Sequence, residues 1–126
     1  MLKKGLSYTL EKVISSSETA IKMESGGLDV FSTPNLIAFM EKTAFLSVEK
    51  YLDKENTTVG ISINAKHLKA NLVEDKLNCI STLIEIDGKK LSFEIVVIHE
   101  ETIVGSCFHD RFIVNKKKFI NKLIKR

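Results

Sequence analysis

One segment constrains the fold of this 126-residue chain more than any other, because its helical pattern is apolar on both faces. The segment runs from Thr33, a good N-cap residue, to about Leu52, and Pro34 suits the first helical position, where its missing N–H leaves no bond unmade. Helical spacing puts Leu36, Phe39, Met40 and Leu46 on one face and Ile37, Ala44, Phe45, Val48 and Leu52 on the other. Such a helix is buried nearly all round, so the rest of the chain must wrap around it.

The segments on either side of this helix are predicted to be strands. Two modest strands precede it, and longer alternating segments follow it: residues 6–14, 19–24, 60–70, 76–86, 90–98 and 102–114. Asp87-Gly88, which is typical of a β-hairpin turn, lies between the segments at 76–86 and 90–98. From Asn115 onward the apolar residues fall on one side of a short C-terminal helix: Phe119, Ile120, Leu123 and Ile124.

This order of elements predicts an α+β fold in a single domain spanning residues 1–126. A curved antiparallel sheet wraps around one central helix, and a short C-terminal helix follows; this is the hotdog arrangement. A single sheet leaves the far side of the central helix poorly covered. We therefore expect a homodimer or a higher oligomer.

The composition predicts a soluble, cytoplasmic protein without a membrane partner. No run approaches the ~18 apolar residues of a membrane span, and the N-terminal segment has no apolar stretch of signal-peptide length. Cys79 and Cys107 lie in apolar stretches, which predicts buried, reduced thiols. His67, His99 and His109 lack the spacing of metal ligands, so neither a metal nor a cofactor is predicted.

The net charge of +3 comes from the C-terminal tail. Residues 116–126 hold six of the nineteen basic residues and none of the sixteen acidic ones. The first 115 residues are therefore mildly acidic, which argues against a nucleic-acid module with a basic surface spread over its fold. The tail itself has two interpretations: a terminal helix with solvated lysines, or a segment that recruits nucleic acid or an acidic partner.

Glu41 is the most informative residue of the central helix. On a helical wheel it lies among apolar residues: Ile37, Ala38, Ala44, Phe45, Val48 and Leu52 all fall within about 60° of it. A carboxylate is unfavourable in such a place unless it is paired or protonated. Glu41 is therefore either a member of a structural ion pair, or on a locally exposed side of the helix, or a catalytic carboxylate tuned by its surroundings.

Thr33 and His67 are the other candidates for catalysis. Thr33 lies two turns before Glu41, so the two side chains can border one pocket, and a helix N-terminus favours an oxyanion or a leaving thiolate. His67 shares the alternating face of Ile61, Ile63 and Ala65, which should point inward. A lone inward histidine is more often a core residue than a catalyst, but a buried glutamate on the central helix shifts the balance toward function.

These residues occur within a longer pattern between Val30 and Val114. The segments VFSTPNLIAFMEKTAFLSVEKYL, VGISINAKHLKANLVEDKL, GKKLSFEIVV and GSCFHDRFIV together resemble the fluoroacetyl-CoA thioesterase-like hotdog proteins. The resemblance covers about two-thirds of the chain. It implies a hotdog dimer that hydrolyses acyl-CoA thioesters, with its site near the dimer interface.

The resemblance also assigns roles to individual residues. The family's catalytic threonine, glutamate and histidine fall on Thr33, Glu41 and His67. A glycine whose backbone lines the acyl pocket falls on Gly60, and an arginine near the active site falls on Arg111. In this hypothesis Thr33 and Glu41 position or deliver the nucleophile, His67 is the general acid–base group, and the Gly60 N–H helps to hold the carbonyl.

Two departures from the family bear on the substrate. Pro34 stands where the family has glycine, and the phenylalanines that close over fluoroacetate have no counterpart between Glu24 and Val30. The predicted lining, Phe31, Ile37, Ile61 and Ile63, is apolar. We therefore expect hydrolysis of uncharged short- or medium-chain acyl-CoA thioesters. The alternative is a protein that binds acyl-CoA or a related metabolite without turnover; a hotdog dehydratase is less favoured, because its acidic and histidine motif is absent.

Overall fold

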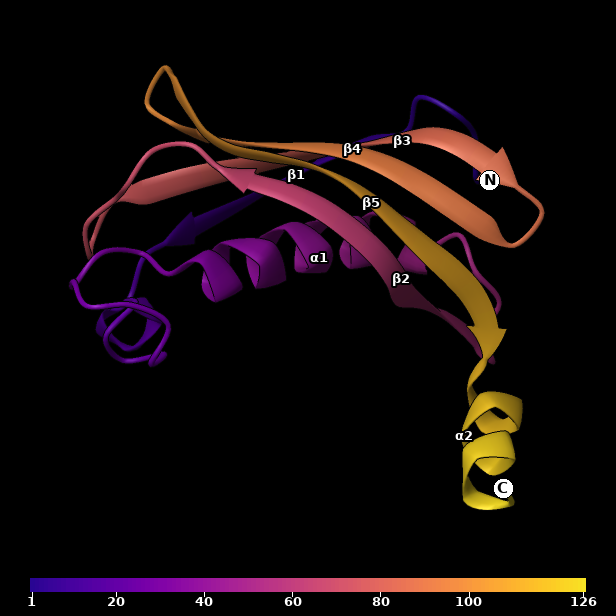
Figure 1. Cartoon of the computed structure of the whole chain (residues 1–126). Coiled ribbons are helices and arrows are strands. Elements are labelled where there is room, and N and C mark those ends of the chain that lie inside the picture. Colours follow the sequence, from indigo (N-terminus) through magenta and orange to yellow (C-terminus); the bar gives the residue numbers. More distant parts are fainter.

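The computed structural model describes all 126 residues and contains one five-stranded sheet, one long helix and a C-terminal helix (Figure 1). The main elements are β1 (Ser7–Val13), α1 (Thr33–Glu49), β2 (Asn56–His67), β3 (Lys76–Asp87), β4 (Lys90–His99), β5 (Thr102–Asn115) and α2 (Lys116–Ile124). The strands pair antiparallel in the order β1-β3-β4-β5-β2. This order leaves β1 and β2 as the two edges of the sheet.

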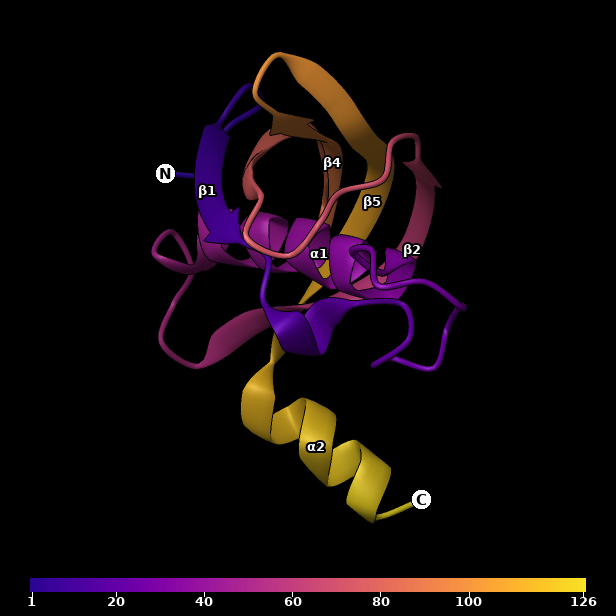
Figure 2. The same ribbon diagram turned by 90° about the vertical axis from the view of Figure 1, so that its left-hand side faces the viewer.

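The sheet curves around α1 as the alternating apolar pattern predicted (Figure 2). Register shifts occur in three of its pairings, and such bulges bend a strand and increase its twist. The inner residues of β3 and β4 are buried against the helix in strict alternation. The α+β hotdog architecture predicted from the order of the elements is confirmed.

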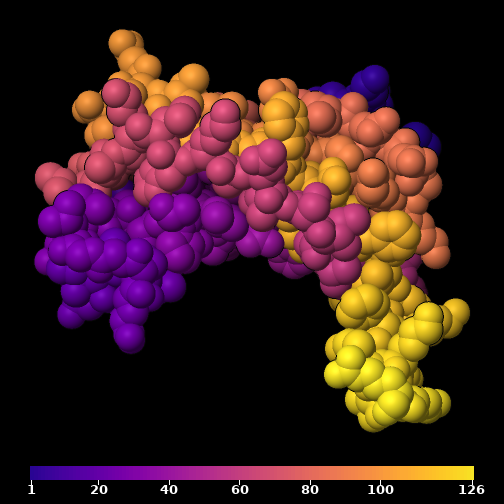
Figure 3. Space-filling model, in the orientation of Figure 1, coloured from indigo at the N-terminus to yellow at the C-terminus, as the bar shows by residue number.

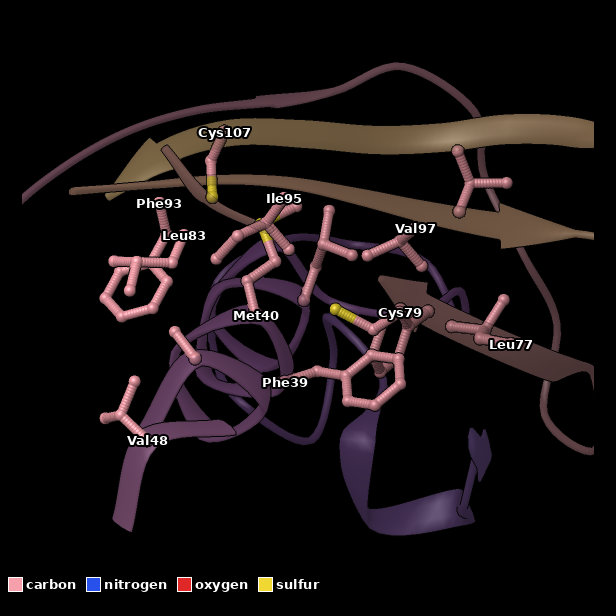
Figure 4. Close-up of a cluster of buried hydrophobic side chains, with 14 of the residues drawn as sticks. Phe39, Met40, Val48, Leu77, Cys79, Leu83, Phe93, Ile95, Val97 and Cys107 are labelled. Atoms are coloured by element: carbon pink, nitrogen blue, oxygen red, sulfur yellow. The ribbon is translucent and has the colours of Figure 1, made fainter. Parts of the chain in front are cut away.

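The core lies between the concave face of the sheet and one side of α1 (Figure 4). Phe39, Met40 and Val48 of the helix meet the inward side chains of the central strands, and sixteen buried apolar residues form one cluster. Cys79 and Cys107 belong to this cluster as free thiols. Burial raises the pKa of Cys79 to about 11 and that of Cys107 to about 12, so both stay protonated at neutral pH. The prediction of buried, reduced cysteines is confirmed.

The start and end of α1 differ from the prediction. Ser32, not Thr33, is the N-cap, because its side chain accepts a hydrogen bond from the Asn35 N–H. Thr33 is the first helical residue, which frees its hydroxyl for other contacts. The helix ends at Glu49 rather than near Leu52.

The strand predicted at residues 19–24 is wrong. This segment forms turns, and only an isolated bridge joins Thr19 to Phe31. Glu24 has a left-handed backbone with φ 57°, which no strand tolerates. Ile21 and Met23 are consequently exposed rather than paired with the sheet.

One side of α1 is covered by the sheet and the other is open within a single chain. Ala38 and Lys42 are exposed and Ile37 and Phe45 are half-buried, so the prediction of a helix buried nearly all round does not hold for one chain. A broad hollow lies below α1, between the segment that precedes this helix and the projecting α2 (Figure 3). None of the helices is both long and apolar enough to span a bilayer.

Candidate active site

Thr33 and His67 meet where the start of α1 faces the end of β2. The Thr33 Oγ1 and His67 Nδ1 atoms lie 2.8 Å apart, within hydrogen-bonding distance. A cavity of about 240 Å³ adjoins them and is lined by Val30, Phe31, Thr33, His67, Leu68, Lys69 and Ala70. The structure thus brings together two of the three predicted catalytic residues and places Phe31, predicted to line the acyl pocket, beside them.

The environment of His67 favours its neutral form. Burial lowers the pKa of this imidazole, and the nearby Lys69 backbone opposes the shift only in part. Its Nε2 atom is buried without a hydrogen-bond partner. At neutral pH the ring is therefore uncharged, and Nδ1 accepts a hydrogen bond from the Thr33 hydroxyl when the ring is in its Nε2–H tautomer.

Glu41 lies in a second cluster, one that does not include Thr33 or His67. A Cβ atom built on Gly60 would lie 3.1 Å from Glu41 Oε2, 3.3 Å from His109 Cε1 and 3.5 Å from Arg111 Nη1. The absence of a side chain at Gly60 therefore leaves the space in which these three groups converge. Gly60 and Arg111 are also direct partners in the β2–β5 pairing.

Arg111 is buried and its guanidinium is held from several sides. It donates from Nε to Thr58 Oγ1 at 2.7 Å, from Nη2 to the Thr58 carbonyl at 3.0 Å and from Nη1 to His109 Nε2 at 3.1 Å. Burial lowers its pKa, while the Glu41 carboxylate raises it by favouring the charged form. The result is a fixed positive group next to Glu41 and Gly60.

His109 is a site residue that the sequence analysis missed. Its Nδ1 donates to the Ser62 carbonyl at 2.8 Å, which leaves Nε2 as the acceptor for Arg111. The two bonds require the neutral Nδ1–H tautomer, and burial together with the Arg111 charge lowers the pKa of the ring. Strand alternation could have identified it, because His109 lies two residues before Arg111 on β5 and the two side chains therefore share the inner face.

A bulge in β2 shapes this region. The pairing with β5 shifts between Gly60 and Ser62, so Ile61 is the extra residue and is 52% exposed. The prediction that Ile61 shares the inward face of His67 is therefore wrong. Ile63 and Ala65, which follow the bulge, pack against the core as predicted.

The two clusters lie at different points along α1 and β2, which run in opposite directions. Glu41 lies eight residues beyond Thr33, which is about 12 Å of helix rise. Correspondingly, His67 is the last residue of β2, whereas Gly60 lies seven residues earlier, near the middle of the strand. Within one chain, no hydrogen bond or ion pair joins Glu41 to Thr33 or to His67.

Comparison with known proteins identifies relatives of this arrangement. The family model described as fluoroacetyl-CoA-specific thioesterase matches residues 14–117. The fluoroacetyl-CoA thioesterase of Streptantibioticus cattleyicolor is 23% identical over 95 residues, which make up 75% of this chain and 68% of that protein.

Solved structures share the fold over nearly the whole chain. A structure of the fluoroacetyl-CoA thioesterase FlK superposes with a TM-score of 0.94 at 20% identity, covering 100% of this chain and 98% of that one. A hypothetical protein of Thermus thermophilus, a thioesterase superfamily member, gives a TM-score of 0.90 at 17% identity and covers 100% and 93%. A hot-dog-like protein from Thermanaerovibrio acidaminovorans gives 0.90 at 16% identity, covering 99% and 93%.

Proposed function

This chain belongs to the fluoroacetyl-CoA-specific thioesterase family, and on that premise we propose that it hydrolyses short- and medium-chain acyl-CoA thioesters at a site built around Thr33 and His67. The observation that carries the proposal is the 2.8 Å contact between Thr33 Oγ1 and His67 Nδ1 beside a cavity in which four of the seven lining residues are apolar. A hydroxyl and a neutral imidazole in contact are the parts that acyl transfer requires.

The chemistry follows from the positions of these two groups. Neutral His67 accepts a proton from the Thr33 hydroxyl, or from a water held by it, as the oxygen attacks the thioester carbon. The imidazolium then returns the proton to the departing CoA sulfur as the C–S bond breaks. Where the Thr33 oxygen is the attacking atom, a water molecule then attacks the acyl-threonine ester, with His67 accepting the water proton and returning it to Thr33 as the carboxylic acid leaves. Thr33 is in the first turn of α1, where the helix dipole favours negative charge developing on the carbonyl oxygen.

We further propose that the complete site forms in a homodimer. β2 is an exposed edge strand, and such an edge pairs readily with a second copy. We place the two-fold axis of this dimer midway between Gly60 and His67 on β2, facing the part of α1 between Thr33 and Glu41. It would bring Glu41 and Gly60 of the partner subunit beside Thr33 and His67, and so unite the two clusters.

A complementation experiment tests the composite site. His67→Ala and Glu41→Gln chains, each inactive alone, are co-expressed with different tags and the heterodimer is isolated. If the two residues act across the interface, one of its two sites is intact and it recovers about half of the wild-type kcat. His99→Ala, which removes a half-buried histidine at the end of β4 that bonds to the Lys76 carbonyl, is the matched control and should retain full activity. A heterodimer as inactive as its parents contradicts a site shared between subunits.

The substrate follows from the cavity beside His67. Val30, Phe31, Leu68 and Ala70 supply the apolar part of its lining, which suits an uncharged acyl group. Thr33, His67 and Lys69 supply the polar part. No aromatic residue between Glu24 and Val30 closes over a two-carbon group. The kcat/KM values of acetyl-, fluoroacetyl-, butyryl- and hexanoyl-CoA should therefore differ modestly. Expressed as activation free energies, the differences should be about 1–3 kcal/mol per methylene or small group. A fluoroacetyl preference above about a thousand-fold in kcat/KM exceeds that range and contradicts this account.

A non-catalytic acyl-CoA binder remains the second candidate, because Glu41 contacts neither Thr33 nor His67 within one chain. Release of free thiol from acetyl-CoA by wild-type protein but not by His67→Ala separates the two. We also propose a cytoplasmic location, supported by two unpaired cysteines in the core. Cell fractionation tests it.

A further inference from the structure

A second cavity, of about 730 Å³, lies between α2 and the end of the sheet, away from Thr33 and His67. Figures 1 and 3 show α2 projecting from the end of β5. The cavity is lined by four lysines and two phenylalanines, among other residues, and by no acidic side chain: Lys89, Lys118, Lys122, Lys125, Phe112 and Phe119. Its size lies within the range of small-molecule sites, roughly 300–1,000 Å³.

The local structure holds the walls of this cavity in place. Phe112 follows the inward Arg111 on β5 and therefore projects from the opposite, outer face of the sheet. The Ile113 N–H donates to the Lys89 carbonyl at 2.9 Å, which ties the β3–β4 turn to β5. At the start of α2, Asn115 caps the helix by accepting from the Lys118 N–H at 3.0 Å.

Helical spacing places the three cavity-lining lysines of α2 on the same side of the helix. Lys118, Lys122 and Lys125 recur at intervals of four and three residues and so share one side of the helix. The apolar residues Ile120, Leu123 and Ile124 lie on the other side. None of the four lysines at the cavity forms a salt bridge, so their charges are not neutralised within the chain.

We propose that this cavity binds a phosphorylated nucleotide. Lysine ammonium groups are compact charges that pair with phosphates, and exposed phenylalanine rings offer flat surfaces on which a base stacks. Phe112 and Phe119 are each 39% exposed, so both rings are accessible. If the proposed function holds, the nucleotide end of CoA is one source of this ligand; a free nucleotide is the other.

Calorimetry with adenosine 3′,5′-bisphosphate tests the site without reference to catalysis. The wild-type protein should bind it, and Lys118→Gln/Lys122→Gln should bind about three- to tenfold more weakly, with the difference shrinking at high salt. Lys116→Gln/Lys117→Gln removes the same charge from the same helix at residues that do not line the cavity, and should leave binding unchanged. Phe112→Ala should also weaken binding.

Kinetics identify the source of the nucleotide. If the cavity holds the substrate, Lys118→Gln/Lys122→Gln raises KM for acetyl-CoA about three- to tenfold relative to KM for S-acetylpantetheine, which has no nucleotide. Bisphosphate binding with an unchanged KM ratio supports the cavity as a site for a free nucleotide. A wild-type protein that binds the bisphosphate but hydrolyses neither thioester refutes the proposed function and leaves the nucleotide site supported.

Two results would overturn the inference. One is no detectable bisphosphate binding at millimolar concentration together with an unchanged KM ratio. The other is a single-stranded oligonucleotide that binds far more tightly than the bisphosphate and loses its affinity equally in both double-lysine variants. That outcome would mean that the charges of the tail bind nucleic acid without specificity, rather than that the cavity selects a nucleotide.

Discussion

Replacing Gly60 with alanine tests whether the space above this glycine serves catalysis. The new Cβ would lie 3.1 Å from Glu41 Oε2 and 3.3 Å from His109 Cε1, so each group must move by a few tenths of an ångström. The Glu41 carboxylate is the end of a flexible side chain and moves easily. Gly60 does not have a positive φ, so alanine adds no backbone strain. The His109 ring is buried and held by two hydrogen bonds, so it moves less easily, but alanine offsets part of that cost by restricting the unfolded chain. The free energy of unfolding should therefore change by less than ~1 kcal/mol.

The effect on catalysis should be larger than the effect on stability. Because a misplacement of about 1 Å costs up to about a hundredfold in rate, a shift of a few tenths should lower kcat/KM about tenfold, or ~1.4 kcal/mol. Thiol release from acetyl-CoA measures the rate, and thermal unfolding measures the stability.

Two other glycines provide controls for this substitution. Gly27→Ala meets no atom within 4 Å and should change neither quantity. Gly105→Ala would put its Cβ 2.8 Å from Leu36 Cδ2 and 3.1 Å from Met40 Cε, so it should destabilise the core by about 1–3 kcal/mol. Full activity in folded Gly60→Ala would refute the reasoning, as would a loss of stability as large as the loss of activity.

Three further predictions separate structure from chemistry. Ser32→Ala should lower the free energy of unfolding by about 1 kcal/mol because it removes the N-cap of α1. Thr33→Ala should leave the melting temperature unchanged and lower kcat by roughly a hundredfold. An equal fall in melting temperature in both variants would contradict a structural role for Ser32 and a chemical role for Thr33. Because burial lowers the pKa of His67, kcat/KM should hold as the pH falls through 6.5 and decline only below it; a decline centred above 6.5 would contradict a neutral buried base. The lowered pKa of His109 means that the unfolded chain binds more protons below pH 6.5, so stability should fall as the pH drops through 6.5 toward the folded-state pKa. Urea unfolding of wild type and His109→Gln at pH 5.5 and 7.5 should show a smaller pH dependence in the variant, and an equal dependence would refute the assignment.

Strong local patterns made the main elements of this fold predictable. The helix at Thr33–Glu49 was predictable because few helices are apolar on both faces, and such a helix is stable only where other elements cover it. Asp87-Gly88 predicted the β3–β4 hairpin because Gly88 adopts the positive φ, 62°, that a tight turn requires.

Where neighbouring residues had similar propensities, the prediction failed. Ser32 and Thr33 are both good N-caps before Pro34, and only the geometry of the Asn35 N–H distinguishes them. The apolar residues at 19–24 alternate like a strand but are followed by Ser25-Gly26-Gly27, and they have no neighbouring strand to pair with. In both places tertiary context decided between nearly equal local choices.

The bulge in β2 explains why periodicity alone could not assemble the site. Gly60 and His67 are seven residues apart, so in a regular strand their side chains would point to opposite faces of the sheet. The alternation that placed His67 inward therefore placed Gly60 outward, and only the family resemblance associated both with one site. Ile61, the extra residue of the bulge, corrects the parity, so that Gly60 faces Glu41 while His67 still faces Thr33. One edge strand thereby presents both clusters to α1, and a two-fold axis between them can then bring the clusters of two subunits together.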